Sequence, residues 1–257
     1  MVLYAGMPDR TLRERLLAGE TVVGPFQSIA SPFITEIIGH AGFDFTILDQ
    51  EHGPLTASDC VGLCAAAENV GMTPIIRVRN NSEGEIQRAL DIGGGVEIPQ
   101  IESMKDAKDA VSYSRFDPLG SRGLSPYVRS GAYDGGDRYT DRQNEERTVI
   151  IHVEGQRAVG NVEEILQVPG IDVVFLGPYD LSQSLGIPGQ VRDERVESQM
   201  EHVCELAAEA ETVVGTYADD PGMANRWIDA GVQFLALSVD TPIIRRRFAA
   251  LRGELDA

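Results

Sequence analysis

Two acidic residues, Glu154 and Asp180, stand where predicted strands run into loops. Glu154 directly follows the run Thr148–Val153, and Asp180 follows the run Asp172–Leu176 after a Gly-Pro-Tyr turn. Carboxylate oxygens are hard donors, and Mg2+ commonly uses one or two of them while keeping sites for water and substrate oxygens. The pair therefore predicts a divalent metal site. The alternative is that each carboxylate caps the next helix or pairs with an arginine.

His52 lies in an acidic turn that follows another predicted strand end at Asp49. The Gly-Pro pair that follows His52 stiffens this turn and holds the imidazole at the strand end. Because imidazole titrates near neutrality, it can carry protons in a reaction run there. Asp49, or Asp91 at the end of a predicted helix, could orient the ring. The alternative is a purely structural histidine.

Arg77 emerges from an apolar run, Pro74-Ile75-Ile76. A guanidinium in such surroundings is costly unless it meets a carboxylate or an oxyanion. We expect either an anionic substrate or intermediate, or an internal salt bridge with Asp49 or Glu51, and the two roles can coexist.

Lysine usage narrows the chemistry, because Lys105 and Lys108 are the only lysines and both fall in a predicted helix. Aldolases that form an imine need a lysine at a strand end. Carbanion chemistry in this chain would therefore require a metal as its electron sink. The chain also has no phosphate-binding P-loop and no dinucleotide-binding glycine motif after a first strand, so we expect no organic cofactor.

The elements that must position these residues alternate along the whole chain. Short β-branched or aromatic runs predict strands at Thr21–Gln27, Asp44–Asp49, Thr73–Val78, Gly95–Gln100, Thr148–Val153, Asp172–Leu176, Thr212–Thr216 and Gln233–Ser238. Helices are predicted at Ser31–Gly39, Ser58–Val70, Ser82–Ile92, Ser103–Ser114, Ala158–Val168, Val196–Ala210, Met223–Asp229 and Ile243–Leu251. Eight strand–helix pairs predict an α/β fold, a (β/α)8 barrel formed by residues 1–257 as one domain. In such barrels the reacting groups gather at the carboxyl ends of the strands.

Two segments lie outside this alternation. Arg10–Leu17 predicts an extra N-terminal helix covering the bottom of the barrel. Phe116–Arg147 is too long for an ordinary connection, which predicts a functional loop or a subunit contact.

The charge balance is 22 basic against 40 acidic residues, a net charge of −18. Nucleic-acid binding depends on clustered Lys and Arg, so we expect no nucleic-acid partner. The acid-rich, lysine-poor composition also suggests adaptation to high salt, with an incidental acidic bias as the alternative.

Met1–Gly6 is too short an apolar run for a signal peptide and lacks its basic leader, and no later run approaches membrane-spanning length. We therefore expect a cytoplasmic protein with no membrane partner. Cys60, Cys64 and Cys204 fit neither a disulfide framework nor a zinc motif, so they are predicted core residues.

Several short motifs occur in one order along nearly the whole chain. They are Ser31-Pro32, Ala41-Gly42-Phe43-Asp44, Leu48-Asp49-Gln50-Glu51-His52-Gly53-Pro54, Ile76-Arg77-Val78, Pro118-Leu119-Gly120-Ser121-Arg122-Gly123, Val153-Glu154, Leu176-Gly177-Pro178-Tyr179-Asp180-Leu181-Ser182 and Val239-Asp240-Thr241. In these motifs the sequence resembles the HpcH/HpaI aldolase family of metal-dependent class II pyruvate aldolases, which includes 4-hydroxy-2-oxoheptanedioate and 2-dehydro-3-deoxyglucarate aldolases.

The resemblance implies a TIM barrel of the phosphoenolpyruvate/pyruvate type. It implies reversible cleavage of a 4-hydroxy-2-oxo acid to pyruvate and an aldehyde through a metal-bound pyruvate enolate. The cofactor would be Mg2+ or Mn2+, with Co2+ as a further option, and the chain would form homo-oligomers, hexamers built as trimers of dimers with the last helix exchanged between subunits.

The resemblance also assigns roles to the residues already singled out. Glu154 and Asp180 would be the metal ligands, His52 the acid–base residue with Asp49 and Asp91 in support, and Arg77 the stabiliser of the enolate oxygen. Backbone amides around Gly177-Pro178-Tyr179-Asp180 would hold the pyruvate carboxylate at a helix start, which makes Gly177, Pro178 and Tyr179 the expected substrate-binding residues there.

Some positions depart from the family pattern. His152 stands where the family commonly has a glutamine that binds near the substrate keto oxygen, so it is the expected substrate-binding residue at that position. Gly155 replaces a polar residue, and Glu97 places an acid in the fourth strand. Other readings are therefore an oxaloacetate decarboxylase, a citrate-lyase-like acyl-CoA lyase, or a barrel that binds a 2-oxo acid without turnover.

Overall fold

The computed structural model describes residues 10–255. Met1–Gly6, on which the expectation of no signal peptide rests, lies outside that range.

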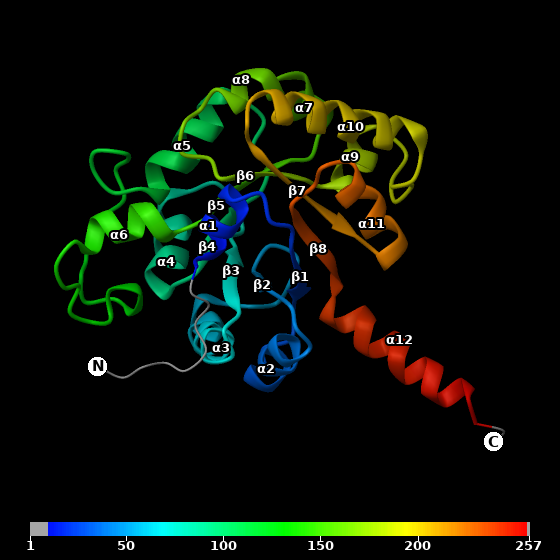
Figure 1. Ribbon diagram of the computed structural model, residues 1–257, viewed down its shortest axis with the longest axis horizontal. Helices are drawn as coiled ribbons and strands as arrows, with labels where there is room; N and C mark the ends of the chain where they lie inside the picture. The colour runs from blue at the N-terminus through cyan, green and yellow to red at the C-terminus, as the bar shows by residue number, and fades with distance from the viewer. Residues whose placement is uncertain (1–9, 256–257) are drawn as a thin grey trace.

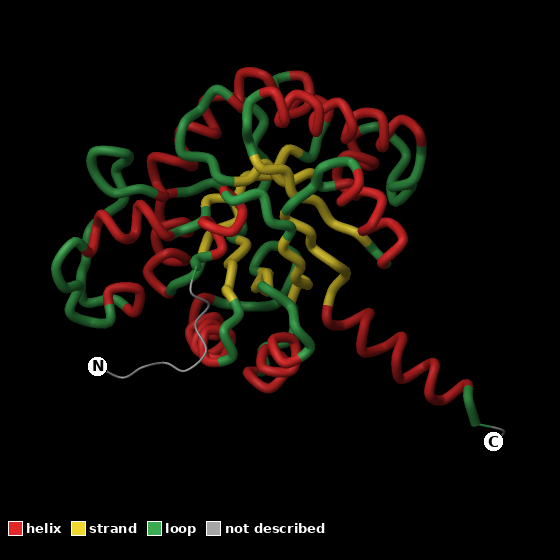
Figure 2. The backbone as a smooth tube through the Cα atoms, in the orientation of Figure 1, coloured by secondary structure: helices red, strands yellow, loops and turns green. Residues whose placement is uncertain are grey.

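Eight parallel strands close into a barrel in chain order, with each strand paired to its neighbours in sequence and β1 paired to β8. Figures 1 and 2 show the strands at the centre of the molecule with the helices around them. The strands are β1 (Val22–Gln27), β2 (Phe45–Asp49), β3 (Thr73–Arg77), β4 (Gly95–Ile98), β5 (Val149–Val153), β6 (Val173–Leu176), β7 (Val213–Ala218) and β8 (Phe234–Val239). The predicted (β/α)8 barrel is confirmed, and every predicted strand overlaps an observed one.

Alternation along the strands separates two cores. Side chains on one face of each strand fill the barrel, among them Ile47, Ile75, Ile150 and Phe234. Side chains on the other face pack against the surrounding helices in a larger apolar cluster. Because successive residues of a strand point to opposite faces, the residues two beyond Ile47, Ile75 and Ile150 also face the barrel interior. Those residues are Asp49, Arg77 and His152.

The helices follow the predicted order with three differences. They are α1 (Leu12–Leu17), α2 (Pro32–His40), α3 (Ala57–Asn69), α4 (Glu83–Ile92), α5 (Met104–Ser114), α6 (Tyr139–Glu146), α7 (Gln156–Gly160), α8 (Val162–Leu166), α9 (Pro178–Ser184), α10 (Glu194–Glu209), α11 (Pro221–Asp229) and α12 (Asp240–Gly253), with a 3-10 turn, η1, at Arg129–Gly131. The single helix predicted over Ala158–Val168 is wrong, because Asn161 ends α7 and starts α8. Two helices were not predicted: α9, directly after β6, and α6, inside the long segment 116–147.

Helix α1 covers the bottom of the barrel as predicted. Thr11 and Glu14 form a reciprocal capping box at its start. Its buried residues Leu12 and Leu16 join the same apolar cluster as the barrel-filling side chains. The helix therefore completes the barrel core at the amino-terminal ends of the strands.

The long segment 116–147 packs beside the barrel, away from the strand ends that carry the predicted site. Arg129 pairs with Glu68 of α3 and donates to the carbonyl of Ile92, and Arg122 pairs with Asp91. The segment lines neither of the two cavities described below, which counts against a functional loop in the site of its own chain. A subunit contact stays a prediction, and Leu119, Leu124, Tyr127 and Tyr133 are exposed there.

Helix α12 extends away from the barrel, as Figure 1 shows. Asp240 is its only buried residue, whereas Ile243, Phe248 and Leu251 are exposed. Among residues 10–255 no helix has the length and apolarity needed to cross a membrane.

Candidate active site

The carboxyl ends of the strands surround a cavity of about 500 Å3. Nine of the ten predicted site residues come together here, and the tenth, Asp91, does not. The cavity is lined by Phe26, Ser28, Asp49, His52, Arg77, His152, Glu154, Phe175, Gly177, Pro178, Tyr179, Asp180, Tyr217 and Val239. The predicted position of the site, at the mouth of the barrel, agrees with this geometry.

Arg77 and Asp49 form a two-pronged ion pair inside the barrel. The neighbouring strands β2 and β3 place them in direct register. Arg77 Nε donates to Asp49 Oδ1 at 2.9 Å and Nη2 donates to Oδ2 at 2.7 Å, and Phe26 stacks against the guanidinium at 4.5 Å. Burial opposes ionisation of Asp49, but the hydrogen bonds and charge of Arg77 hold its pKa below the ordinary value. Arg77 is thus fixed as a cation facing the cavity.

Glu51 is a further partner of Arg77, with 3.3 Å between Nη1 and Oε2. Burial and the negative charge of Glu154 raise the pKa of Glu51 against the lowering effect of Arg77. The salt bridges expected for Arg77, with Asp49 or Glu51, are therefore both present.

His52 lies at the exposed rim of the cavity, and its side chain is 66% exposed. Asp49 Oδ1 accepts from the backbone N–H groups of Glu51 and His52, at 3.0 and 3.2 Å. Asp49 therefore fixes the turn that carries His52 and does not contact its ring nitrogens.

Asp91 was predicted to support His52, and within the chain this prediction is wrong. Asp91 is near the last turn of α4, close to the amino-terminal end of β4. Helices of a barrel run back from the carboxyl ends of the strands, so this turn lies toward the opposite end from His52. Its carboxylate instead pairs with the buried Arg122 at 2.7 Å.

Glu154 and Asp180 face the same cavity from consecutive strand ends. Burial raises the pKa of Asp180, and the negative charge of Glu154 raises it further. Burial opposes ionisation of Glu154. The positive charge and hydrogen bond of His152, together with the hydrogen bond from the Gln100 backbone N–H, nevertheless lower the pKa of Glu154, so this carboxylate is ionised. The two carboxylates thus repel one another across a partly desolvated cavity.

Gly177 allows the two strand ends to approach closely. A Cβ atom at Gly177 would lie 2.7 Å from Glu154 Oε2, which is too short for any side chain. Helix α9 begins immediately afterwards at Pro178, with Gly177 as its N-cap. The first N–H groups of a helix have no partner within it, so those of Tyr179 and Asp180 are available at this wall of the cavity.

His152 lines the cavity, as expected for a substrate-binding residue, but both of its ring nitrogens have partners within the protein. Its Nδ1–H donates to Glu154 Oε2 at 2.8 Å and its Nε2–H donates to Glu97 Oε1 at 2.6 Å. Burial opposes protonation, yet the two carboxylates raise its pKa to about 10. Since both ring nitrogens are engaged and the residue is buried, His152 is a cation that holds Glu154.

The residues around the two carboxylates fit a divalent cation. Among residues 10–255 no three His, Cys, Asp or Glu side chains are arranged as a closed metal site. Glu154 and Asp180 instead offer a pair of hard oxygen donors, the arrangement in which Mg2+ keeps positions for water and substrate. A cation there would also relieve the repulsion that raises the pKa of Asp180.

Two acidic residues of this region, Glu97 and Asp219, were not predicted as site residues. Glu97, the acid noted in the fourth strand, lies fully buried beneath His152, and an acid in the middle of an apolar run was the available signal. At the rim, Asp219 accepts from the hydroxyls of Tyr179 at 2.9 Å and Tyr217 at 3.1 Å. Burial, together with Asp219, raises the pKa of both tyrosines. No local pattern marks that cluster.

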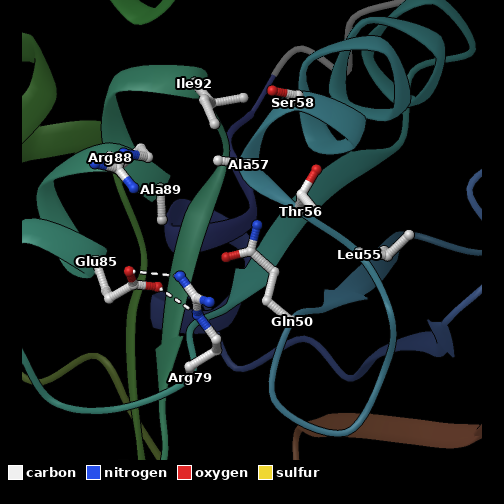
Figure 3. A pocket seen from close by; sticks show the side chains of 10 residues that line it. All are labelled: Gln50, Leu55, Thr56, Ala57, Ser58, Arg79, Glu85, Arg88, Ala89 and Ile92. Carbon is white, nitrogen blue, oxygen red and sulfur yellow. Dashed lines mark hydrogen bonds and ion pairs between the residues drawn. The ribbon is translucent and has the colours of Figure 1, made fainter.

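A second cavity of about 270 Å3 is lined by residues at the start of α3, on α4 and in the loops that precede these helices (Figure 3). It is lined by Gln50, Leu55, Thr56, Ala57, Ser58, Arg79, Glu85, Arg88, Ala89 and Ile92. The side chains of Arg79 and Glu85 are paired at its edge. None of the predicted catalytic or metal-binding residues lines it.

Comparison with known proteins gives consistent matches over most of the chain. The HpcH/HpaI aldolase/citrate lyase family matches residues 23–246. The chain is 34% identical to the 2-keto-3-deoxy-L-rhamnonate aldolase of Klebsiella pneumoniae, over 93% of this chain and 92% of that protein. An HpcH/HpaI aldolase/citrate lyase family protein from Burkholderia cenocepacia superposes with a TM-score of 0.91 at 32% identity, covering 96% and 99% of the two chains. The citrate synthase SbnG superposes with a TM-score of 0.86 at 31% identity, covering 95% and 96%.

Proposed function

Because the chain belongs to the HpcH/HpaI aldolase/citrate lyase family, we propose that it cleaves a 4-hydroxy-2-oxo acid reversibly to pyruvate and an aldehyde with a divalent metal, Mg2+ or Mn2+. The observation that carries this proposal is the meeting of Glu154, Asp180, Arg77 and His52 around one cavity. The similarity to an aldolase named for a 2-keto-3-deoxy sugar acid supports the same reaction class.

Glu154 and Asp180 would hold the cation. When bound, it supplies Lewis-acid polarisation of the substrate's keto oxygen. The N–H groups at the start of α9 would bind the substrate carboxylate beside that pair. This placement orients the reacting carbons toward the side of the cavity that carries Arg77 and His52.

His52 would transfer protons, and Arg77 would stabilise the negative charge that forms on the substrate. His52 takes the proton of the 4-hydroxyl group as the C3–C4 bond breaks, which releases the aldehyde, and the electron pair passes to the keto oxygen. Arg77, held in place by Asp49, stabilises the resulting enolate oxygen. His52 then returns a proton to C3, and pyruvate leaves.

Two treatments test this proposal together. EDTA should abolish pyruvate release from a 4-hydroxy-2-oxo acid, and added Mn2+ should restore it. Borohydride should not trap pyruvate on the protein, since neither Lys105 nor Lys108, both on helix α5, lines the cavity. Covalent trapping, or full activity in EDTA, would overturn the proposed mechanism.

A second candidate is carbon–carbon chemistry on oxaloacetate or an acyl-CoA. The similarity to a protein named citrate synthase favours it. The net charge of −18 disfavours binding of the anionic coenzyme. Citrate formation from oxaloacetate and acetyl-CoA, assayed beside aldol cleavage with the same enzyme sample, discriminates the two reactions.

We also propose an oligomer in which α12 packs on another subunit. The exposed Ile243, Phe248 and Leu251 on a helix that leaves the barrel support this arrangement. Light scattering after size exclusion should give a mass several times 27.9 kDa. Phe248→Asp should reduce that mass, whereas a monomeric parent chain would contradict the proposal.

A further inference from the structure

A chain of three side chains runs from the barrel interior to the cavity. Glu97 lies in the middle of β4, where its neighbours in register are Arg77 and Ile150. Its Oε1 accepts from His152 Nε2 at 2.6 Å, and His152 Nδ1 donates to Glu154 Oε2 at 2.8 Å. Glu97 does not line the cavity and so does not contact a substrate held there.

Glu97 is fully buried, and its Oε2 has no hydrogen-bond partner among the described residues. A carboxylate in such a place is costly unless a positive charge compensates it. His152 contacts the other oxygen of Glu97 at 2.6 Å, and the Arg77 guanidinium belongs to the residue beside Glu97 in register on the neighbouring strand. Since an apolar side chain at this position would fill the barrel at lower cost, the acid needs an explanation beyond packing.

The orientation of His152 is fixed on three sides. Glu97 holds one ring nitrogen, Glu154 holds the other, and Phe175 stacks on the ring with centroids 4.6 Å apart and planes 19° apart. Glu154 is fixed in turn, because its Oε1 accepts from the Gln100 amide at 2.8 Å. Each carboxylate oxygen of Glu154 thus accepts one hydrogen bond, which leaves its other lone pair free to bind a cation in the cavity.

We propose that Glu97 is a positioning residue that orients Glu154 through His152 and so presets the carboxylate for the cation. This inference rests on the proposed function, in which Glu154 is a metal ligand. Partners that orient a metal ligand through a second side chain typically change metal affinity by about 10- to 100-fold when removed. Glu97 acts in that manner from inside the barrel.

A consequence is that Glu97 and His152 depend on each other. His152→Gln alone leaves the Glu97 carboxylate buried without the imidazole that contacts it, which destabilises the fold. Adding Glu97→Leu removes that carboxylate. The double variant should therefore melt at a higher temperature than His152→Gln by about 5 °C or more, the sign of a direct interaction.

The experiment compares Mn2+ affinity, by calorimetry on metal-free protein, with crystal structures of the same variants. Glu97→Leu should weaken Mn2+ binding about tenfold or more and displace the Glu154 carboxylate. Glu97→Gln, which keeps an acceptor for His152 Nε2–H, should retain more of the affinity. Asp172→Asn is the matched control, because Asp172 is a buried carboxylate paired with Arg13 and Arg115 at the other end of the barrel. It should lower the melting temperature without changing the Mn2+ affinity.

Two outcomes would overturn the inference. One is a folded Glu97→Leu protein with Glu154 in its original position and unchanged Mn2+ affinity. The other is an equal loss of affinity in Asp172→Asn, which would make the effect a general one of stability. If the parent chain bound no Mn2+, the proposed function would fail, and the position of Glu154 in the Glu97→Leu crystal would still decide the role of Glu97.

Discussion

The barrel holds a buried arginine–aspartate pair near each end, and only one of them faces a cavity. Arg77 and Asp49 join at the carboxyl ends of the strands, where Arg77 lines the cavity. Arg115 and Asp172 join at the entry to β6, where Arg115 also donates to the carbonyls of Asn144, Arg147 and Gly170, and Asp172 accepts from Arg13 and the Val149 amide. Burial lowers the pKa of Arg115, whereas the partners of Arg77 raise its pKa against burial. Buried charge alone therefore does not mark a functional site; access to a cavity does.

The largest expected effect is the difference between replacing Glu154, at the cavity, and replacing Asp172, at the opposite end of the barrel. Glu154→Gln should reduce aldol cleavage about a thousandfold, the scale of losing a preorganised charge-stabilising group. It should lower the melting temperature less than Asp172→Asn does, because His152 keeps Glu97 as a charge partner. Asp172→Asn should do the reverse, lowering stability and leaving kcat unchanged. Kinetics and thermal unfolding of both variants check this, and a parallel loss of activity would break the comparison.

Replacing Arg77 should likewise affect mainly activity, and replacing Arg115 mainly stability. Arg77→Met is expected to lower kcat about 100-fold, because it removes the cation beside the developing enolate. Arg115→Met should lower the free energy of unfolding by about 3 kcal/mol, the cost of leaving Asp172 buried with fewer partners. Urea titration and steady-state kinetics measure the two losses. Equal kinetic effects would mean that Arg77 only supports the fold.

The dependence of the melting temperature on pH should show whether His152, at the cavity end of the barrel, is a buried cation. Because the folded pKa of His152 is raised to about 10, its contribution to stability is complete below the unfolded value of about 6.5 and is lost as pH rises through 10. The melting temperature of the parent chain should therefore fall between pH 7 and pH 10 more than that of the double variant Glu97→Leu/His152→Gln. Parallel curves would show that His152 is not a buried cation.

Added salt should change activity and stability the least, because it should not weaken the buried Arg77–Asp49 and Arg115–Asp172 ion pairs. KCl screens exposed charges much more than buried ones. If the acidic surface reflects adaptation to high salt, activity and stability should both rise with KCl toward molar concentrations, by about 1 kcal/mol or less in stability. Stability that is flat or falls with KCl would favour an incidental acidic bias.

The barrel and most of the site were predictable because they depend on local patterns. Strand periodicity and the polar residues at strand ends predict Glu154, Asp180, Arg77 and His52 as site residues, and all four line the cavity. A parallel barrel converts those sequence positions into spatial neighbours, since all its strands end at one mouth.

What the sequence did not reveal is mainly which side chains interact, because residues far apart in sequence meet only in the folded chain. Asp91 was assigned to His52, but a helix that runs back along the barrel carries it toward the other end, to Arg122. Glu97, 55 positions from His152, was not foreseen as the partner of its second ring nitrogen. The break at Asn161 likewise depends on packing that periodicity does not encode.

The most direct test of the central claim uses pyruvate alone, because enolate formation does not require the aldehyde to be known. Proton NMR in D2O should show exchange of the pyruvate methyl protons catalysed by the protein with Mn2+. That exchange should disappear in EDTA and in Glu154→Gln, and should persist in Asp172→Asn. Absence of exchange in the metal-loaded parent chain, or exchange that survives Glu154→Gln, would contradict the account.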